Sequence, residues 1–118
     1  LELVARVESV LRRTGRANVI LHAFGVDLDP AARTVTQNGK PVHLSPREFE
    51  LLELLMRNRG MTLYREVLYE RLWGDDTAFD TRPLDLCITR LRKKLGWKNE
   101  ICTVFRVGYR LEKEENTP

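Results

Sequence analysis

The sequence predicts an α+β fold in which a four-stranded antiparallel sheet precedes three helices and a C-terminal β-hairpin. Three observations support this class. Short alternating or β-branched runs, interrupted by turn residues, fill residues 19–44. A helix-capping sequence at Ser45 then opens the first of three segments whose apolar residues recur at helical spacing. Two more β-branched runs follow Gly96, and 118 residues with 42% hydrophobic content suffice for one core.

The first 20 residues are expected to precede this domain. Apolar side chains recur there at helical spacing, at Leu3, Val4, Val7, Val10 and Leu11. This pattern predicts an amphipathic helix over residues 1–14, followed by a linker over residues 15–20. The chain has no initiator Met and opens inside this helix, so it is expected to be a piece of a longer protein.

Four short strands are expected next. Their predicted bounds are Val19–Phe24, Val26–Leu28, Arg33–Thr36 and Val42–Leu44. Asp29-Pro30 marks a turn, and Asn38-Gly39 is a typical two-residue hairpin loop. A sheet this small requires another element to cover one of its faces.

The helices that follow supply that cover. Ser45, Pro46 and Glu48 form a capping box with proline at the first helical position, and this helix is expected to end at Gly60. A second helix is predicted over Arg65–Leu72, and a third over Arg82–Leu95.

Beyond the third helix, the sequence predicts strands and a polar end. The two strands of the C-terminal hairpin are expected at Cys102–Arg106 and Tyr109–Leu111. Residues 113–118 are expected to form a polar tail, because they lack apolar side chains.

Positive charge is concentrated in one segment. The net charge is only +3, yet residues 82–110 hold eight Lys/Arg against two Asp/Glu, whereas residues 1–81 hold eleven against twelve. A basic segment on an otherwise neutral domain is typical of a polyanion-binding surface, and by charge alone it is equally typical of a solvated basic face.

The third helix has two distinct faces at 100° per residue. Leu84, Ile88, Leu91 and Leu95 form the predicted core face. The predicted outward face holds Arg82, Leu86, Thr89, Arg90 and Lys93. Arginine can donate two hydrogen bonds to guanine, and an apolar side chain such as that of Leu86 can contact a thymine methyl group. We therefore expect this helix to enter the major groove of DNA.

Several motifs in order resemble the winged-helix effector domain of two-component response regulators of the OmpR/PhoB type. They are Leu44–Leu52 (LSPREFELL), Leu72-Trp73-Gly74, Arg82–Leu95 (RPLDLCITRLRKKL) and Gly108–Leu111 (GYRL). The resemblance covers residues 21–112, and residues 1–14 resemble the last helix of the receiver domain that precedes such effectors. It implies a winged helix-turn-helix fold and sequence-specific binding of double-stranded DNA by a cytoplasmic transcription regulator.

The resemblance also implies roles for individual residues. Base-facing positions correspond to Leu86, Cys87, Thr89, Arg90 and Lys93. Phosphate-binding positions correspond to Arg65, Trp73, Arg82 and Tyr109. Wing positions correspond to Thr103, Phe105 and Arg106. A segment that contacts RNA polymerase in some relatives corresponds to Gly74, Asp75, Asp76, Thr77, Ala78, Phe79 and Asp80. Such domains pair head to tail on direct repeats, and a sensor kinase reaches them only through the receiver domain.

Three positions depart from the family pattern. Cys87 stands where the family usually has His, and Tyr64 stands where a Ser commonly caps the second helix. The wing reads Thr103-Val104-Phe105-Arg106, which displaces its arginine by one residue and replaces a tip glycine. Because strand side chains alternate faces, this displacement changes where Arg106 is expected to point.

Other classes of function are less favoured. Catalysis and metal binding lack support, because His22 and His43 lie in strand segments without a nucleophilic partner, and no ligands show zinc-site spacing. No cofactor is expected. A protein-interaction module that docks a partner through the basic helix or residues 74–80 is the main alternative, and RNA ranks lower because its major groove is too narrow for a helix. No segment has the length of apolar sequence that a membrane helix requires.

Overall fold

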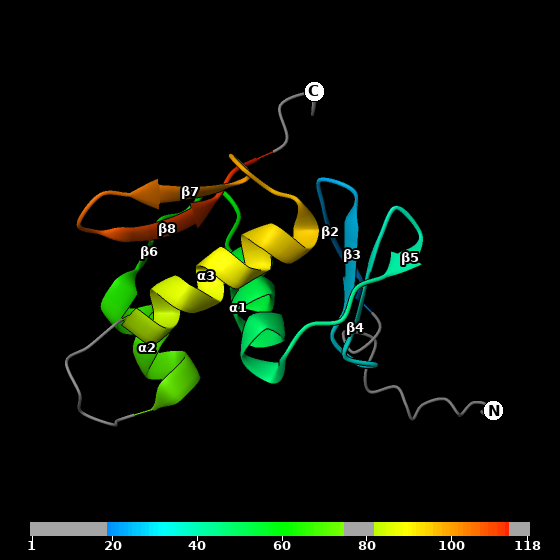
Figure 1. Ribbon diagram of the computed structural model, residues 1–118, viewed down its shortest axis with the longest axis horizontal. Helices are drawn as coiled ribbons and strands as arrows, with labels where there is room; N and C mark the ends of the chain where they lie inside the picture. The colour runs from blue at the N-terminus through cyan, green and yellow to red at the C-terminus, as the bar shows by residue number, and fades with distance from the viewer. Residues whose placement is uncertain (1–18, 75–81, 114–118) are drawn as a thin grey trace.

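The computed structural model describes residues 19–74 and 82–113, which form two sheets and three helices (Figure 1). One sheet comes from the N-terminal half, the helices follow, and a second sheet contains the C-terminal hairpin. The α+β class predicted from the sequence is therefore confirmed. The predicted helix over residues 1–14, the loop residues 75–80 and the tail beyond Lys113 lie outside the described residues.

The N-terminal sheet is a four-stranded antiparallel meander. Its strands are β2 (Leu21–Ala23), β3 (Val26–Asp29), β4 (Thr34–Gln37) and β5 (Lys40–Pro41), in that order across the sheet. Asn38 and Gly39 both have positive φ, so the expected two-residue hairpin loop is present and pairs Gln37 directly with Lys40. The fourth strand consequently begins at Lys40, and its predicted position at Val42–Leu44 was wrong.

The first helix begins where the capping box predicts. Helix α1 spans Pro46–Arg57, with the Ser45 hydroxyl accepting a hydrogen bond from the Glu48 amide, and the Glu48 carboxylate accepting one from the Ser45 amide. Its last residue is Arg57 and its C-cap residue is Asn58, two residues before the predicted end at Gly60.

The other two helices follow the apolar pattern. Helix α2 spans Arg65–Trp73, and its N-cap residue Tyr64 makes no side-chain capping bond, as its identity led us to expect. Helix α3 spans Arg82–Leu95 as predicted. None of the helices in the described part of the chain is long and apolar enough to cross a membrane.

The C-terminal sheet contains a strand that the sequence did not reveal. Strands β7 (Ile101–Val104) and β8 (Gly108–Leu111) form the predicted hairpin, and β6 (Leu63–Tyr64) pairs with the other edge of β8. This pairing requires glycine at position 108, since a Cβ atom there would lie 1.8 Å from the carbonyl oxygen of Leu63. The residue before α2 is thereby fixed to the hairpin.

Helix α3 lies between the two sheets. The N-terminal sheet is on one side of the helices in Figure 1, and the C-terminal sheet is on the other. The Gln37 side-chain amide donates a hydrogen bond of 2.8 Å to the Leu95 carbonyl, which connects β4 to the end of α3. Leucine and isoleucine side chains from all three helices fill a core that is continuous with the buried face of the N-terminal sheet.

Candidate nucleic-acid interface

The two faces of α3 separate as the helical spacing predicts. The apolar side chains of Leu84, Ile88, Leu91 and Leu95 are buried in the core. The exposed residues are Arg82, Leu86, Thr89, Arg90, Lys93 and Lys94. Leu86 retains half of its surface in contact with solvent, at 50% exposure, although it is large and apolar. A single exposed leucine is common on protein surfaces, so the cations around Leu86 are what distinguish this face.

Cys87 does not lie on the outward face, which corrects the base-facing role implied for it. The residue is only 6% exposed and belongs to the hydrophobic core. On a helix it is about 60° from Leu84, at the margin of the buried face. A short thiol at this margin turns inward, and burial, with a smaller contribution from Glu48, raises its pKa to about 11. Cys87 is therefore a neutral core residue at physiological pH.

Some of the cations on α3 serve the fold itself. Lys94 donates a 2.7 Å hydrogen bond to the carboxylate of Glu48, which is only 3% exposed. Burial alone would raise the pKa of Glu48, but the hydrogen bonds from Lys94 and Ser45 outweigh it and hold that pKa below its usual range. Lys94 is consequently a structural residue.

Arg92 also bonds within the protein. Its guanidinium donates hydrogen bonds to the Ile101 carbonyl and, at 3.0 Å, to the Thr103 hydroxyl on β7. Among the described residues, by contrast, the side chains of Arg90 and Lys93 have no hydrogen-bond or ion-pair partner. The helix therefore presents these two cations, together with Leu86 and Thr89, to the exterior.

The acid of α3 bonds to two other elements. Asp85 accepts a 2.7 Å hydrogen bond from Arg65, the first residue of α2, and another from the Tyr109 hydroxyl on β8. The hydrogen bond to Asp85 raises the pKa of Arg65, while burial and that same carboxylate raise the pKa of Tyr109. Tyr109 is 4% exposed, so its hydroxyl is an internal donor, and the phosphate contact implied for it is not supported.

Two other residues with implied phosphate-binding roles, Arg82 and Trp73, are exposed and half-buried respectively. Arg82 is exposed at the start of α3. Trp73 is half-buried at the end of α2, where its ring stacks on Tyr69 at 5.2 Å and lies beneath the guanidinium of Arg47. Gly74 ends α2 with φ of 79°, and it is the only residue of the predicted polymerase-contact segment that the structure describes.

The hairpin tip carries an aromatic ring beside a cation. Phe105 is 78% exposed, and the guanidinium of Arg106 lies 5.1 Å from the centre of its ring. Arg106 has φ of 65°, in the left-handed region that glycine occupies without strain. The turn thus keeps a glycine-like conformation although its glycine is absent. Thr103 is exposed on β7 and accepts the hydrogen bond from Arg92.

The contacts that Asp85 and Arg92 make with the C-terminal sheet were not predicted from the sequence. The sequence assigned no tertiary contact to either residue, whereas each connects α3 to the C-terminal sheet. Their seven-residue spacing places them on one side of a helix, which was an available signal. Their bonding partners, however, become neighbours only in the folded chain.

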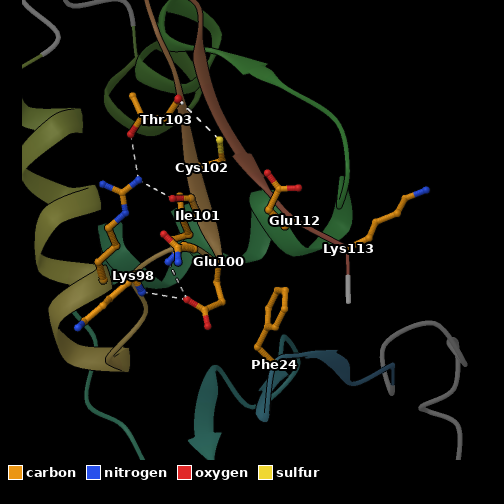
Figure 2. Close-up of a pocket in the computed structure, with 10 residues that line it drawn as sticks. Phe24, Lys98, Glu100, Ile101, Cys102, Thr103, Glu112 and Lys113 are labelled. Atoms are coloured by element: carbon orange, nitrogen blue, oxygen red, sulfur yellow. Dashed lines mark hydrogen bonds between the residues drawn. The ribbon is translucent and has the colours of Figure 1, made fainter. Parts of the chain in front are cut away.

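A cavity of about 730 Å³ lies beside this sheet and carries mixed charge. Phe24, Lys98, Glu100, Cys102, Glu112 and Lys113 are among the residues that line it (Figure 2). The Glu100 carboxylate accepts hydrogen bonds from the amides of Lys98 and Asn99, so it caps its own turn. Within the described residues no group of three or more His, Cys, Asp or Glu is arranged to hold a metal ion.

Comparison with known proteins gives consistent matches. Residues 39–111 match the family described as the C-terminal part of transcriptional regulatory proteins. The chain is similar to the sensory transduction protein RegX3 of Mycolicibacterium smegmatis, with 40% identity over 121 residues, covering 94% of this chain and 53% of RegX3. It spans about half the length of the curated relatives it matches.

Solved structures agree with the fold. The response regulator DrrB of Thermotoga maritima, described as an OmpR/PhoB homologue, superposes with a TM-score of 0.72 at 32% identity, covering 93% of this chain and 51% of DrrB. The DNA-binding domain of RstA from Klebsiella pneumoniae, solved in complex with the RstA box, superposes with a TM-score of 0.71 at 31% identity. That match covers 79% of this chain and 96% of the RstA chain.

Proposed function

The chain belongs to the family of DNA-binding C-terminal domains of transcriptional regulatory proteins, the OmpR/PhoB type, and from this premise we propose how its surface meets DNA. Helix α3 lies in the major groove of a double-stranded operator, and the β7–β8 hairpin (Ile101–Leu111, the wing) lies against the neighbouring minor groove. The domain acts by binding and carries out no catalysis.

One observation carries this proposal: the outward face of α3 holds cations that the fold does not use. Arg92 and Lys94 bond internally, whereas Arg90 and Lys93 project without partners among the described residues. Like charges at this spacing repel one another slightly unless a polyanion lies against them. The phosphates and guanine edges of DNA provide the negative charge that offsets this repulsion, and water alone does not.

The residues divide between base contact and backbone contact. In this proposal Leu86, Thr89, Arg90 and Lys93 face base edges. The Thr89 hydroxyl already donates to the Asp85 carbonyl at 3.0 Å, so it meets DNA as an acceptor and through its methyl group. Arg65, Trp73 and Arg82 hold phosphates, and Thr103, Phe105 and Arg106 form the contact surface of the wing.

The wider setting is part of the same proposal and rests on family membership. The full protein is a cytoplasmic response regulator whose receiver domain, ending in residues 1–14, receives the signal of a sensor kinase. Two copies pair head to tail on a direct repeat. Residues 74–80 contact RNA polymerase.

Titration against mixed-sequence duplex DNA tests the assignment of α3. Fluorescence anisotropy at two salt concentrations would compare the parent with Arg90→Ala and Lys93→Ala, using Lys40→Ala on β5 as a charge-matched control. Binding should weaken with salt, and it should weaken further in each α3 variant, whereas Lys40→Ala should bind like the parent. Binding that is absent at low salt, or equal in all variants, would instead indicate a protein-docking surface.

A further inference from the structure

Helix α3 is joined to the wing by two side chains of opposite charge. Asp85, in the first turn of α3, reaches β8, and Arg92, two turns later, reaches β7. The two lie seven residues apart, so they are within about 20° of each other around the helix and about 10 Å apart along it. Both strands of the hairpin are therefore bonded to one side of the helix.

The contact at Asp85 includes a third element. One carboxylate oxygen accepts the Tyr109 hydroxyl and the other accepts Arg65, whose guanidinium lies 5.8 Å from the centre of the Tyr109 ring. Arg65 is itself bound to the wing, because its amide donates to the Val107 carbonyl at 3.0 Å. Through Asp85, α3 is consequently attached to the unit formed by β6, β8 and the start of α2.

The contact at Arg92 attaches the outer strand. Its hydrogen bonds to the Ile101 carbonyl and the Thr103 hydroxyl, drawn as dashed lines at those residues in Figure 2, occupy the edge of β7 that does not pair with β8. A rotation of the wing about one of the two contacts would break the other. The pair therefore resists both sliding and tilting of the wing along α3.

We propose that Asp85 and Arg92 are positioning residues that fix the distance and angle between the recognition helix and the wing, and thereby set sequence discrimination. The inference rests on the proposed function, in which these two elements enter adjacent grooves. With the wing held rigidly, base contacts by α3 and wing contacts form together only on a site of matching geometry. With the wing loosened, each element adapts separately, and mismatched sites become tolerable.

Because Asp85 and Arg92 have opposite charges, substituting each of them separates an effect of charge from an effect of positioning. Asp85→Ala removes an anion from the DNA-facing helix, so charge alone predicts tighter binding to any duplex. Arg92→Met removes a cation and by charge alone predicts weaker binding. A positioning role instead predicts the same effect in both variants, namely a fall of about tenfold in the ratio of operator affinity to mixed-sequence affinity.

The experiment uses an operator selected from random duplexes with the parent chain, and mixed-sequence DNA as the second ligand. Glu66→Ala and Arg71→Met are matched controls, since both residues are exposed on α2 and form no hydrogen bond or ion pair among the described residues. Tyr109→Phe removes one bond of the contact without any change of charge. It should lower the ratio as well, and it decides the question if Asp85→Ala does not fold.

The outcomes separate the inference from the proposed function. A parent that fails to bind duplex DNA contradicts the proposed function, and with it the inference. A parent that selects an operator, with ratios unchanged in Arg92→Met and Tyr109→Phe, overturns the positioning role alone. Ratios that move in opposite directions with charge would also overturn it.

Discussion

At the scale of single residues, the carboxylate of Glu48 stabilises two parts of the molecule at once. It accepts the Ser45 amide at the start of α1 and the Lys94 ammonium from α3. A buried carboxylate needs such partners, because an ionised group removed from water without them is strongly destabilising. Lys94 thus neutralises a charge that the capping box requires.

Replacement of Lys94 by Met should lower the free energy of unfolding by about 2 kcal/mol at pH 7, since it leaves Glu48 buried without its cation and Lys94 is itself partly solvated. The pKa of Glu48 lies below its usual value near 4.5 in the folded protein. Its ionised form therefore contributes stability above that value, and the contribution is lost as pH falls through the lowered pKa.

Urea denaturation of the parent and of Lys94→Met at pH 7 and pH 3 measures this effect, and the difference between them should shrink at pH 3. The adjacent exposed residue supplies the control, because Lys93→Met should change stability by no more than about 0.5 kcal/mol. An equal loss at both pH values would show that the pair is not responsible.

Arg106 is the residue at which stability and the proposed wing contact are opposed. Its left-handed backbone is unfavourable for any residue with a Cβ atom, by about 1 kcal/mol or more. Arg106→Gly should therefore raise the free energy of unfolding by up to about 1 kcal/mol, yet weaken DNA binding and lower the salt slope by about one. Arg106→Lys should leave both nearly unchanged. An unaltered salt slope in the glycine variant would place Arg106 away from DNA.

At the scale of elements, β6 is a two-residue strand with a large structural effect. It attaches the start of α2 to β8, and the attachment exists only because Gly108 lets the backbone of Leu63 approach. The wing is thus one part of a three-stranded sheet that includes the residues leading into α2.

Gly108→Ala should displace β6 and destabilise the protein by about 2 kcal/mol or more, because the added methyl group meets backbone that cannot move aside. Thermal unfolding followed by circular dichroism measures the loss. Gly39→Ala provides the comparison, since its Cβ would have open space and only the positive φ is unfavourable, by about 1 kcal/mol. Equal losses in the two variants would argue against the close approach at Gly108.

The elements also show what the sequence could and could not predict. Helix α1 was predictable because Ser45, Pro46 and Glu48 form a capping box at its first turn. Helix α3 was predictable because its buried apolar residues recur at helical spacing. Strand β6 was missed, since two residues carry no periodicity and their partner lies some 45 positions along the chain. The fourth strand was predicted at Val42–Leu44 because the apolar residues there were given more weight than the turn. A two-residue turn at Asn38-Gly39 places Lys40 opposite Gln37, so the strand begins at Lys40.

The candidate site divides in the same way. The outward placement of Leu86, Thr89, Arg90 and Lys93 follows from helical angle alone. Cys87 was assigned by position from a family that has the longer His there, and a thiol at the margin of the core lacks the length to reach outward. The internal bonds of Arg92 and Asp85 depend on tertiary neighbours that no local pattern specifies.

At the scale of the whole molecule, α3 is the common support of both sheets. Gln37 connects β4 to the Leu95 carbonyl, while Asp85 and Arg92 connect the same helix to β8 and β7. A helix that bonds to both sheets couples their unfolding, because neither sheet can separate without disturbing contacts made by the other.

The two tryptophans report on the two ends of this arrangement. Trp97 packs edge to face against Phe24 in the turn between β2 and β3, and Trp73 lies at the end of α2. In Trp73→Phe and Trp97→Phe variants, urea unfolding followed by the remaining tryptophan should coincide with the far-ultraviolet circular dichroism transition. Separated midpoints in either variant would mean that the sheets unfold independently.

Helix α3 carries one set of side chains that bond within the protein and another set that do not, and this separation has an evolutionary consequence. The side chains of Leu86, Arg90 and Lys93 make no hydrogen bond or ion pair within the described residues, whereas the side chains of Arg92, Lys94 and Asp85 are held in place by internal bonds. Mutations at the first three positions are therefore nearly neutral for folding, and selection can change them without a loss of stability. Because this face is the one proposed to read bases, a gene duplicate of this domain could acquire a new set of promoters through a few substitutions on one helix face.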